Sequence, residues 1–277
     1  MNKFVTYLAP AKLNLGLKIT GKRNDGYHFL KTVFCLIDLY DEVNIQITEN
    51  GKISLVEHKQ AWPFTDDLSY RAAVLLQEYS GAIYGANIKL NKTIPSGAGL
   101  GGGSSNAATV LLVLNKLWGL NLDKNELIRL GATLGADVPF FIYGENALAT
   151  GIGDIFNPID IPEQYFILVK PSFHIPTKNI FAHLNIDFTH IDEINITAEN
   201  LIMHKQNDLF KVATKLYPQL QNIVNDLSEY GTPAMTGSGS VIYLSFFDKN
   251  IAKKVAKILE SSYNTYLVKR LKESPLR

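Results

Sequence analysis

The sequence predicts an α+β protein of two domains. The chain has 277 residues, and this length favours two domains because a domain of roughly 150 residues is typical. Several short runs alternate apolar and polar residues, as strands do, whereas longer segments carry apolar residues at the helical period. The pattern starts again after Asp154 with a compact apolar run followed by prolines. We therefore expect one domain at residues 1–158 and a second at residues 159–277.

The first domain is predicted to begin with strands and to continue with helices. Residues 13–19 alternate as a half-buried strand does. Similar runs lie at residues 43–47, 53–55 and 87–94. The turn sequence at residues 24–26, Asn-Asp-Gly, is typical of a hairpin. Apolar stripes predict helices at residues 66–80 and 104–118, and Asp123 with Glu126 has the spacing of a capping box at the start of a third.

The second domain is predicted to mix strands and helices from its start. The stretch from Pro171 to Pro176 is expected to be irregular. Pro218 is suited to a first helical turn, and Asp248 is suited to cap a helix. The expected elements are a strand at 165–169, a helix at 218–230, a strand at 241–246, a helix at 248–261 and a strand at 263–271.

Composition excludes several classes of protein. Lys and Arg number 27 and Asp and Glu number 26, which gives a formal charge of +1. A balance so close to zero provides no general attraction to nucleic acid or to an anionic membrane. The single cysteine, Cys35, cannot form an internal disulfide and is expected to be a small core residue. No secretion signal or membrane-spanning run is visible, so we expect a cytoplasmic protein without membrane or nucleic-acid partners.

One glycine-rich segment points to phosphate binding. It follows a predicted strand and runs directly into a predicted helix, whose unpaired N–H groups and positive dipole attract anions. Glycines let backbone N–H groups approach a ligand closely, and Ser104 and Ser105 can both cap the helix and donate hydroxyls to phosphate. The expected ATP-binding residues are Pro95, Ser96, Gly97, Ala98, Gly99, Leu100, Gly101, Gly102, Gly103, Ser104 and Ser105.

Three common phosphate motifs do not account for this segment. Gly97, Gly99 and Gly102 have the dinucleotide-binding spacing, but Asp123 begins a helix where that fold requires the end of a strand. A Walker A loop needs a lysine that the segment lacks, and the H-R-D and D-F-G tripeptides of protein kinases do not occur.

The segment instead resembles the P-x-x-x-G-L-G-G-G-S-S loop of the GHMP kinases. Residues 10–15 and 235–240 resemble the first and third motifs of that superfamily, in the same order along the chain. The resemblance implies a two-domain GHMP kinase fold, with an N-terminal domain like domain 2 of ribosomal protein S5 and a ferredoxin-like C-terminal domain. It also implies ATP as co-substrate, with Mg²⁺ carried on its phosphates; the sequence indicates no dedicated metal ligands.

Within the superfamily, further segments are most similar to the kinases of a cytidine-diphosphate-linked sugar alcohol. These segments are residues 9–15, 25–28, 134–141 and 175–177. The resemblance implies phosphorylation of the 2-hydroxyl of that alcohol, in the non-mevalonate route to isoprenoid precursors. One departure is mild, since Thr236 stands where serine is more usual and keeps the hydroxyl. Alternatives are another GHMP kinase whose substrate has no nucleobase, or a nucleotide-binding protein without catalysis.

Lys12 and Asp137 are the candidate catalytic residues. Asp137 precedes an apolar run, so its carboxylate is expected to be partly desolvated and able to accept a hydroxyl proton; the alternative is a helix cap or a turn residue. Lys12 lies in an apolar strand, where a pair with Asp137 would keep that carboxylate ionised; the alternative is an edge lysine that reaches water. The resemblance assigns catalysis to both.

The candidate substrate residues form a second group. Asn14 lies two residues beyond Lys12 and so on the same strand face, where we expect it to position the alcohol. An aromatic face can stack on a pyrimidine, and an imidazole can hydrogen-bond its edge; the resemblance gives these roles to Tyr27 and His28. It also points to Thr177 and to Phe181, which can equally be a core residue.

We expect a monomer or homodimer. The other histidines lack metal-ligand spacing and are expected at the surface or in the core: His58, His174, His183, His190 and His204.

Overall fold

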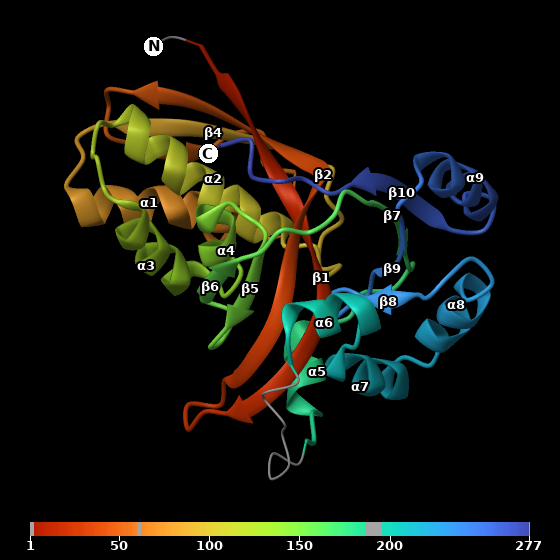
Figure 1. Ribbon diagram of the computed structural model, residues 1–277. Helices are drawn as coiled ribbons and strands as arrows, with labels where there is room; N and C mark the ends of the chain where they lie inside the picture. The colour runs from red at the N-terminus through yellow and green to blue at the C-terminus, as the bar shows by residue number, and fades with distance from the viewer. Residues whose placement is uncertain (1–2, 60–61, 187–195, 277) are drawn as a thin grey trace.

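Two mainly antiparallel sheets, joined by one long hairpin, form the frame of the protein (Figure 1). The computed structural model describes residues 3–59, 62–186 and 196–276. The first sheet has the strand order β3-β4-β2-β5-β6, and β1 pairs with β2 along its whole length. Its strands are β1 (Val5–Lys22), β2 (His28–Thr48), β3 (Ile53–Leu55), β4 (Gly85–Asn91), β5 (Ala147–Thr150) and β6 (Ile155–Pro158).

The hairpin of β1 and β2 turns at the predicted Asn-Asp-Gly sequence, which confirms that prediction. The half-buried interpretation of β1 was wrong, because every residue from Ala9 to Leu17 is buried. The physical reason is that β1 is covered on both faces, by the helices of the first sheet and by the second sheet. The strand expected at residues 87–94 ends at Asn91, where the chain leaves the sheet toward the glycine-rich segment.

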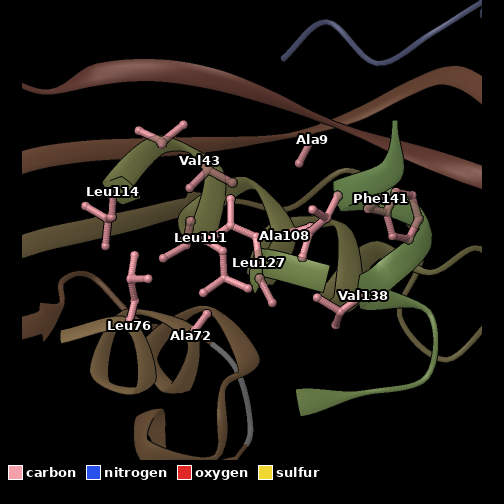
Figure 2. Packing of buried hydrophobic residues seen from close by; sticks show 14 of the residues in the cluster. Ala9, Val43, Ala72, Leu76, Ala108, Leu111, Leu114, Leu127, Val138 and Phe141 are labelled. Atoms are coloured by element: carbon pink, nitrogen blue, oxygen red, sulfur yellow. The ribbon is translucent and has the colours of Figure 1, made fainter. Parts of the chain in front are cut away.

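Four helices and a short 3₁₀ helix, η1 (Phe64–Asp66), accompany the first sheet in the described residues. The helices are α1 (Leu68–Ser80), α2 (Gly102–Leu117), α3 (Lys124–Leu134) and α4 (Val138–Tyr143). Figure 2 shows their apolar side chains, among them Leu76, Leu111 and Phe141, meeting below the sheet residues Ala9 and Val43. The capping box of Asp123 and Glu126 is confirmed, with both of its hydrogen bonds present.

Helix α2 begins earlier than the sequence predicted. Its N-cap is Gly101 in the left-handed region, and no side chain caps it. Ser104 and Ser105 therefore lie within the first helical turn, so the expectation that they cap the helix was wrong. The early start leaves the first backbone N–H groups of the helix next to the glycines that precede it.

The second sheet has the order β10-β7-β9-β8 and carries the later helices on the opposite side of the hairpin from α1–α4 (Figure 1). Its strands are β7 (Tyr165–Lys170), β8 (Ala234–Met235), β9 (Ile242–Phe246) and β10 (Asn264–Lys269). Its helices are α5 (Thr177–Ala182), α6 (Ala198–His204), α7 (Asp208–Leu216), α8 (Gln219–Leu227) and α9 (Lys249–Leu259). The predicted elements are confirmed in kind; α8 and α9 end earlier than expected, and Asp248 caps α9. Helices α5, α6 and α7 were not predicted.

The two halves share an apolar core through β1. Leu13 and Leu15 pack in one cluster with Phe166 and Tyr243 of the second sheet. Because side chains alternate along a strand, Lys12 and Asn14 point to the other side. The boundary between residues 158 and 159 stays a prediction. Within the described part of the chain, no helix combines the length and apolar character needed to span a membrane.

Candidate active site

A buried hydrogen-bonded chain fixes Lys12. Its Nζ donates to Asn14 Oδ1 at 2.7 Å, and Asn14 Nδ2 donates to Thr32 Oγ1 at 2.9 Å. Thr32 Oγ1 in turn donates to the carbonyl of Gly16 at 2.6 Å. Lys12 is 3% exposed, which excludes the edge lysine that reaches water. Its ammonium also lies 5.1 Å from the centroid of the Phe34 ring. The contacts with Asn14 and Phe34 therefore hold the ammonium in one orientation inside the protein.

Asp137 completes a pair with Lys12. Its Oδ2 lies 3.4 Å from Lys12 Nζ, and its side chain is 34% exposed. Asp137 occupies the N-cap position of α4 but accepts no capping hydrogen bond, so its carboxylate is not spent on the helix. The buried residues Val138 and Phe140 anchor α4 in the core and hold the carboxylate in place. The geometry is therefore that of a buried cation beside a carboxylate that ligands can reach.

The glycine-rich segment passes directly over this pair. The backbone N–H of Lys12 donates to the carbonyl of Leu100 at 3.0 Å. Gly101 has a φ of 73°, and a Cβ there would lie 2.7 Å from the Phe141 ring and 3.3 Å from Lys12 Cε. At Gly99, a Cβ would lie 2.4 Å from the carbonyl of Thr236. Both positions thus require glycine, for conformation and for space.

Thr236 connects the first and second motifs. The backbone N–H of Asn14 donates to Thr236 Oγ1 at 2.9 Å, and that hydroxyl lies 3.4 Å from the carbonyl of Gly99, to which it donates. Next to it, Thr177 Oγ1 and Ser238 Oγ share a hydrogen bond of 2.7 Å. The three motif segments thus form one bonded unit, to which both sheets contribute.

Two cavities meet at this unit. The larger has a volume of about 710 Å³ and is lined by all the predicted catalytic and substrate residues, Lys12, Asn14, Tyr27, His28, Asp137, Thr177 and Phe181. The smaller, about 340 Å³, is lined by every predicted loop residue except Leu100 and Ser105, each of which is buried at 1% exposure. Both cavities are lined by Gly99, Ser104, Asp137 and Thr177. The Asp137 carboxylate therefore borders both spaces.

Aromatic rings border one part of the larger cavity. The rings of His28 and Phe181 have centroids 5.5 Å apart and are tilted by 33°, while Tyr27 is 59% exposed. Burial of the imidazole, and secondarily the nearby Lys22 ammonium, lowers the pKa of His28 below its usual range. This shift favours the neutral imidazole at pH 7, in which one ring nitrogen donates a hydrogen bond and the other accepts one.

Among the described residues, no group of three or more His, Cys, Asp and Glu side chains is arranged to hold a metal ion. Cys35 is fully buried, and this burial raises the pKa of its thiol to about 12, so it is the expected small core residue. His190 lies outside the described residues.

Sequence reasoning missed several residues of the site. Thr236 and Ser238 lie in the third motif, from which no role for them could be predicted, and the local sequence around Thr32 gave no signal. His174, expected at the surface or in the core, is exposed, and its Nδ1 lies 3.0 Å from the carbonyl of Gly97, so it holds the loop from the second half of the chain.

This fold and its three joined segments define a GHMP kinase. The sequence profile of the GHMP kinases N terminal domain matches residues 67–145, and that of the GHMP kinases C terminal domain matches residues 192–265. A solved homoserine kinase from Cytophaga hutchinsonii has the same fold, with a TM-score of 0.73 at 16% identity over 99% of this chain and 96% of that one.

Relatives with higher sequence identity to this chain place it in one group of GHMP kinases. The 4-diphosphocytidyl-2-C-methyl-D-erythritol kinase of Neisseria meningitidis serogroup A is 47% identical over 97% of this chain and 95% of its own. That of Chromobacterium violaceum is 43% identical over 99% and 97%. The crystal structure of a 4-(cytidine 5'-diphospho)-2C-methyl-D-erythritol kinase gives a TM-score of 0.82 at 33% identity, covering 96% of this chain and 99% of that one. The chain therefore belongs to the GHMP kinases, and within them to the 4-diphosphocytidyl-2-C-methyl-D-erythritol kinases.

Proposed function

We propose that this enzyme transfers the γ-phosphoryl group of ATP to the 2-hydroxyl of 4-diphosphocytidyl-2-C-methyl-D-erythritol, in the non-mevalonate route to isoprenoid precursors. One observation carries the proposal: the Asp137 carboxylate borders both a cavity lined by the glycine loop and a cavity bordered by aromatic rings. A phosphoryl donor in the first and an alcohol in the second would meet beside that carboxylate.

The proposed reaction needs few protein groups. Asp137 accepts the proton of the 2-hydroxyl, whose oxygen attacks the γ-phosphorus while the bond to the bridging oxygen of ADP breaks. Lys12 stabilises the negative charge of the Asp137 carboxylate and of the transferred group. Backbone N–H groups of residues 97–105 and the N-terminus of α2 hold the phosphates. Asn14, fixed by Lys12 and Thr32, orients the alcohol.

Mg²⁺ fits the residues at the junction of the cavities. Ser104 and Asp137 offer oxygen atoms there, and Mg²⁺ on nucleotide phosphates prefers oxygen ligands with few protein contacts. We propose Ser104 as its protein ligand. When bound, the ion would neutralise charge on the phosphates of ATP.

The aromatic residues supply the preference for a cytidine substrate. Tyr27 and Phe181 line the cavity, and the imidazole of His28 lies beside the Phe181 ring. Stacking of a base on an aromatic ring contributes about 1–3 kcal/mol. We propose that this part of the cavity holds the cytosine, while Thr177, hydrogen-bonded to Ser238, borders the phosphates.

The test is release of ADP with the cytidine-linked alcohol as acceptor. We expect Asp137→Asn and Lys12→Ala each to lower kcat by about a hundredfold or more, since both groups act in the transition state. Glu229→Gln, which changes an exposed carboxylate, serves as control. Turnover of either variant within a few-fold of the parent would contradict the proposed mechanism.

Two alternatives give different results in the same assay. Another GHMP kinase would phosphorylate mevalonate, homoserine or a sugar, and Tyr27→Ala would hardly affect it because those acceptors have no base. A nucleotide-binding protein would bind ATP without releasing ADP with any acceptor. Phe247→Ala removes a ring that is 76% exposed and lies outside the cavity lining, and so controls for loss of an aromatic side chain.

We further propose that the enzyme works in the cytoplasm, where ATP is supplied, as a monomer or homodimer without nucleic-acid partners. The net charge of +1 supports the last point. Sedimentation velocity at micromolar concentration tests the oligomeric state.

A further inference from the structure

A second buried ion pair, distinct from the catalytic pair of Lys12 and Asp137, lies beneath the glycine loop. The carboxylate of Asp41, on β2, is 0% exposed and pairs with the ammonium of Lys92, whose side chain is 17% exposed. Asp41 Oδ1 also accepts hydrogen bonds from the backbone N–H groups of Thr93 and Ile94, at 2.7 and 2.8 Å. One carboxylate thus fixes three consecutive residues that lead from β4 into the loop.

The same carboxylate lies against the first turn of α2. A Cβ at Gly102 would lie 3.0 Å from Ile94 Cγ2 and 3.4 Å from Asp41 Oδ2. The helix end that is proposed to hold the phosphates therefore rests on the segment that Asp41 anchors. Lys92 and Ile94 also line the smaller cavity, so a shift of this segment would change its shape.

This arrangement places a negative charge next to an anion-binding helix end. An uncompensated carboxylate there would repel the phosphates of ATP, and in a buried position solvent screens such a charge weakly. The Lys92 ammonium removes this repulsion while leaving the acceptor oxygens of Asp41 in place. At the surface, neither residue could both cancel this repulsion and keep the Asp41 oxygens as acceptors for the loop backbone.

We propose that Asp41 and Lys92 are a positioning pair for the nucleotide. Asp41 anchors the backbone that supports the glycine loop, and Lys92 neutralises Asp41 so that the N-terminus of α2 keeps its attraction for phosphate. Neither residue touches the reacting atoms. The inference rests on the proposed function only in taking ATP as the ligand of the smaller cavity.

Three variants separate the two roles. Lys92→Met leaves a buried unpaired carboxylate. Asp41→Asn with Lys92→Met keeps the oxygen acceptor but has no charge, and Asp41→Ala with Lys92→Met has neither. Lys89→Met is the matched control, because Lys89 on β4 forms an exposed ion pair with Glu57 at 2.6 Å. The measurements are KM for ATP, KM for the alcohol, and the rise in Tm on adding ATP.

We expect Lys92→Met to raise KM for ATP by about tenfold or more, because the unpaired, buried carboxylate of Asp41 would then repel the phosphates of ATP with little screening by solvent. KM for the alcohol should change by no more than about twofold, and the Asn–Met double variant should return KM for ATP to within about threefold of the parent. The Ala–Met variant should again weaken ATP binding, since Thr93 and Ile94 then lose their acceptor. A merely structural role would not divide the two KM values in this way.

Several results would overturn the inference. If the Asn–Met variant binds ATP as poorly as Lys92→Met, then Lys92 does not act by neutralising Asp41. If the Ala–Met and Asn–Met variants have equal KM for ATP, Asp41 does not anchor the loop. Should Lys92→Met fail to fold, the Asn–Met variant decides: ATP affinity near that of the parent supports the pair, and a loss beyond about tenfold contradicts it. The Tm shift uses ATP alone, so a parent that binds ATP but phosphorylates no alcohol would refute the proposed function separately.

Discussion

Lys12 Nζ lies 2.7 Å from Asn14 Oδ1, so a buried amide on the same strand face orients the cation of the site. The amide is itself held by Thr32, on β2, which forms the second strand of the hairpin. The hairpin therefore supplies both the cation and the groups that hold it. This chain of contacts explains how a lysine that is 3% exposed keeps a fixed position beside Asp137.

Replacement of Thr32 by valine should loosen that chain without changing its shape. Asn14 Nδ2 then loses its acceptor in a buried site, which costs about 1–3 kcal/mol in the free energy of unfolding. We expect kcat to fall as well, because the Asn14 amide is free to turn and Lys12 loses its fixed partner. Urea unfolding and ADP release measure the two effects. Thr32→Ser, which keeps the hydroxyl, is the control, and equal behaviour of the two variants would contradict this account.

The pKa of His28 predicts how substrate binding depends on pH. Burial first, and Lys22 second, lower this pKa in the free enzyme, and a base stacked nearby would remove more water and lower it further. The neutral form is then the binding form. Affinity for the alcohol should be constant above pH of about 6.5 and should fall as the pH drops through the lowered pKa.

Two variants test that assignment. Lys22→Met removes a cation that disfavours the imidazolium, so the fall in affinity should move to higher pH. His28→Gln should abolish this titration. Isothermal titration with the alcohol between pH 5 and 8 measures both, and a profile that is the same in all three proteins would rule out His28 as the titrating group.

Much of the candidate site could be predicted because it is encoded locally. The period of two along β1 placed Lys12 and Asn14 on one face, and the structure confirms this arrangement. The pair of Lys12 with Asp137 joins residues far apart in the sequence and was predicted with the help of the family resemblance; the charged atoms lie 3.4 Å apart. The start of α2 was misjudged because serine is the commoner cap, whereas here Gly101 begins the helix with a φ of 73°.

Contacts between distant segments could not be predicted in this way. Asn14 and Thr236 are 222 residues apart, and Asp41 and Lys92 are 51 apart. The residues next to each of them in the sequence are ordinary. Such neighbours do not distinguish a buried carboxylate from an exposed one. Only the packing of β2 against the segment after β4 makes Asp41 a buried anchor.

Cys35 should report on unfolding of the hairpin. It is fully buried on β2, and burial raises the pKa of its thiol to about 12. Because the thiolate is the reactive form, alkylation of the folded protein at pH 8 should be slower than that of the unfolded chain by about a thousandfold or more. Mass spectrometry after iodoacetamide treatment measures the rate. Labelling of the folded protein at a rate near that of the unfolded chain would contradict the burial of Cys35 in the hairpin.

Lys178 should strengthen binding of the diphosphate part of the alcohol. Lys12 and Lys178 are the two lysines that line the larger cavity, and Lys178 lies three residues before Phe181 on α5, so both face the same side of the helix. A diphosphate attached to a base near Phe181 would then lie within reach of its ammonium. Because Lys178 is exposed, solvent screens the attraction, and Lys178→Ala should raise KM for the alcohol by about threefold at low salt and less at high salt. KM for ATP should not change, and Lys253→Ala, at an exposed lysine of α9, is the control. If the effect of Lys178→Ala is the same at every salt concentration, the contribution is not electrostatic and the lysine does not bind the diphosphate.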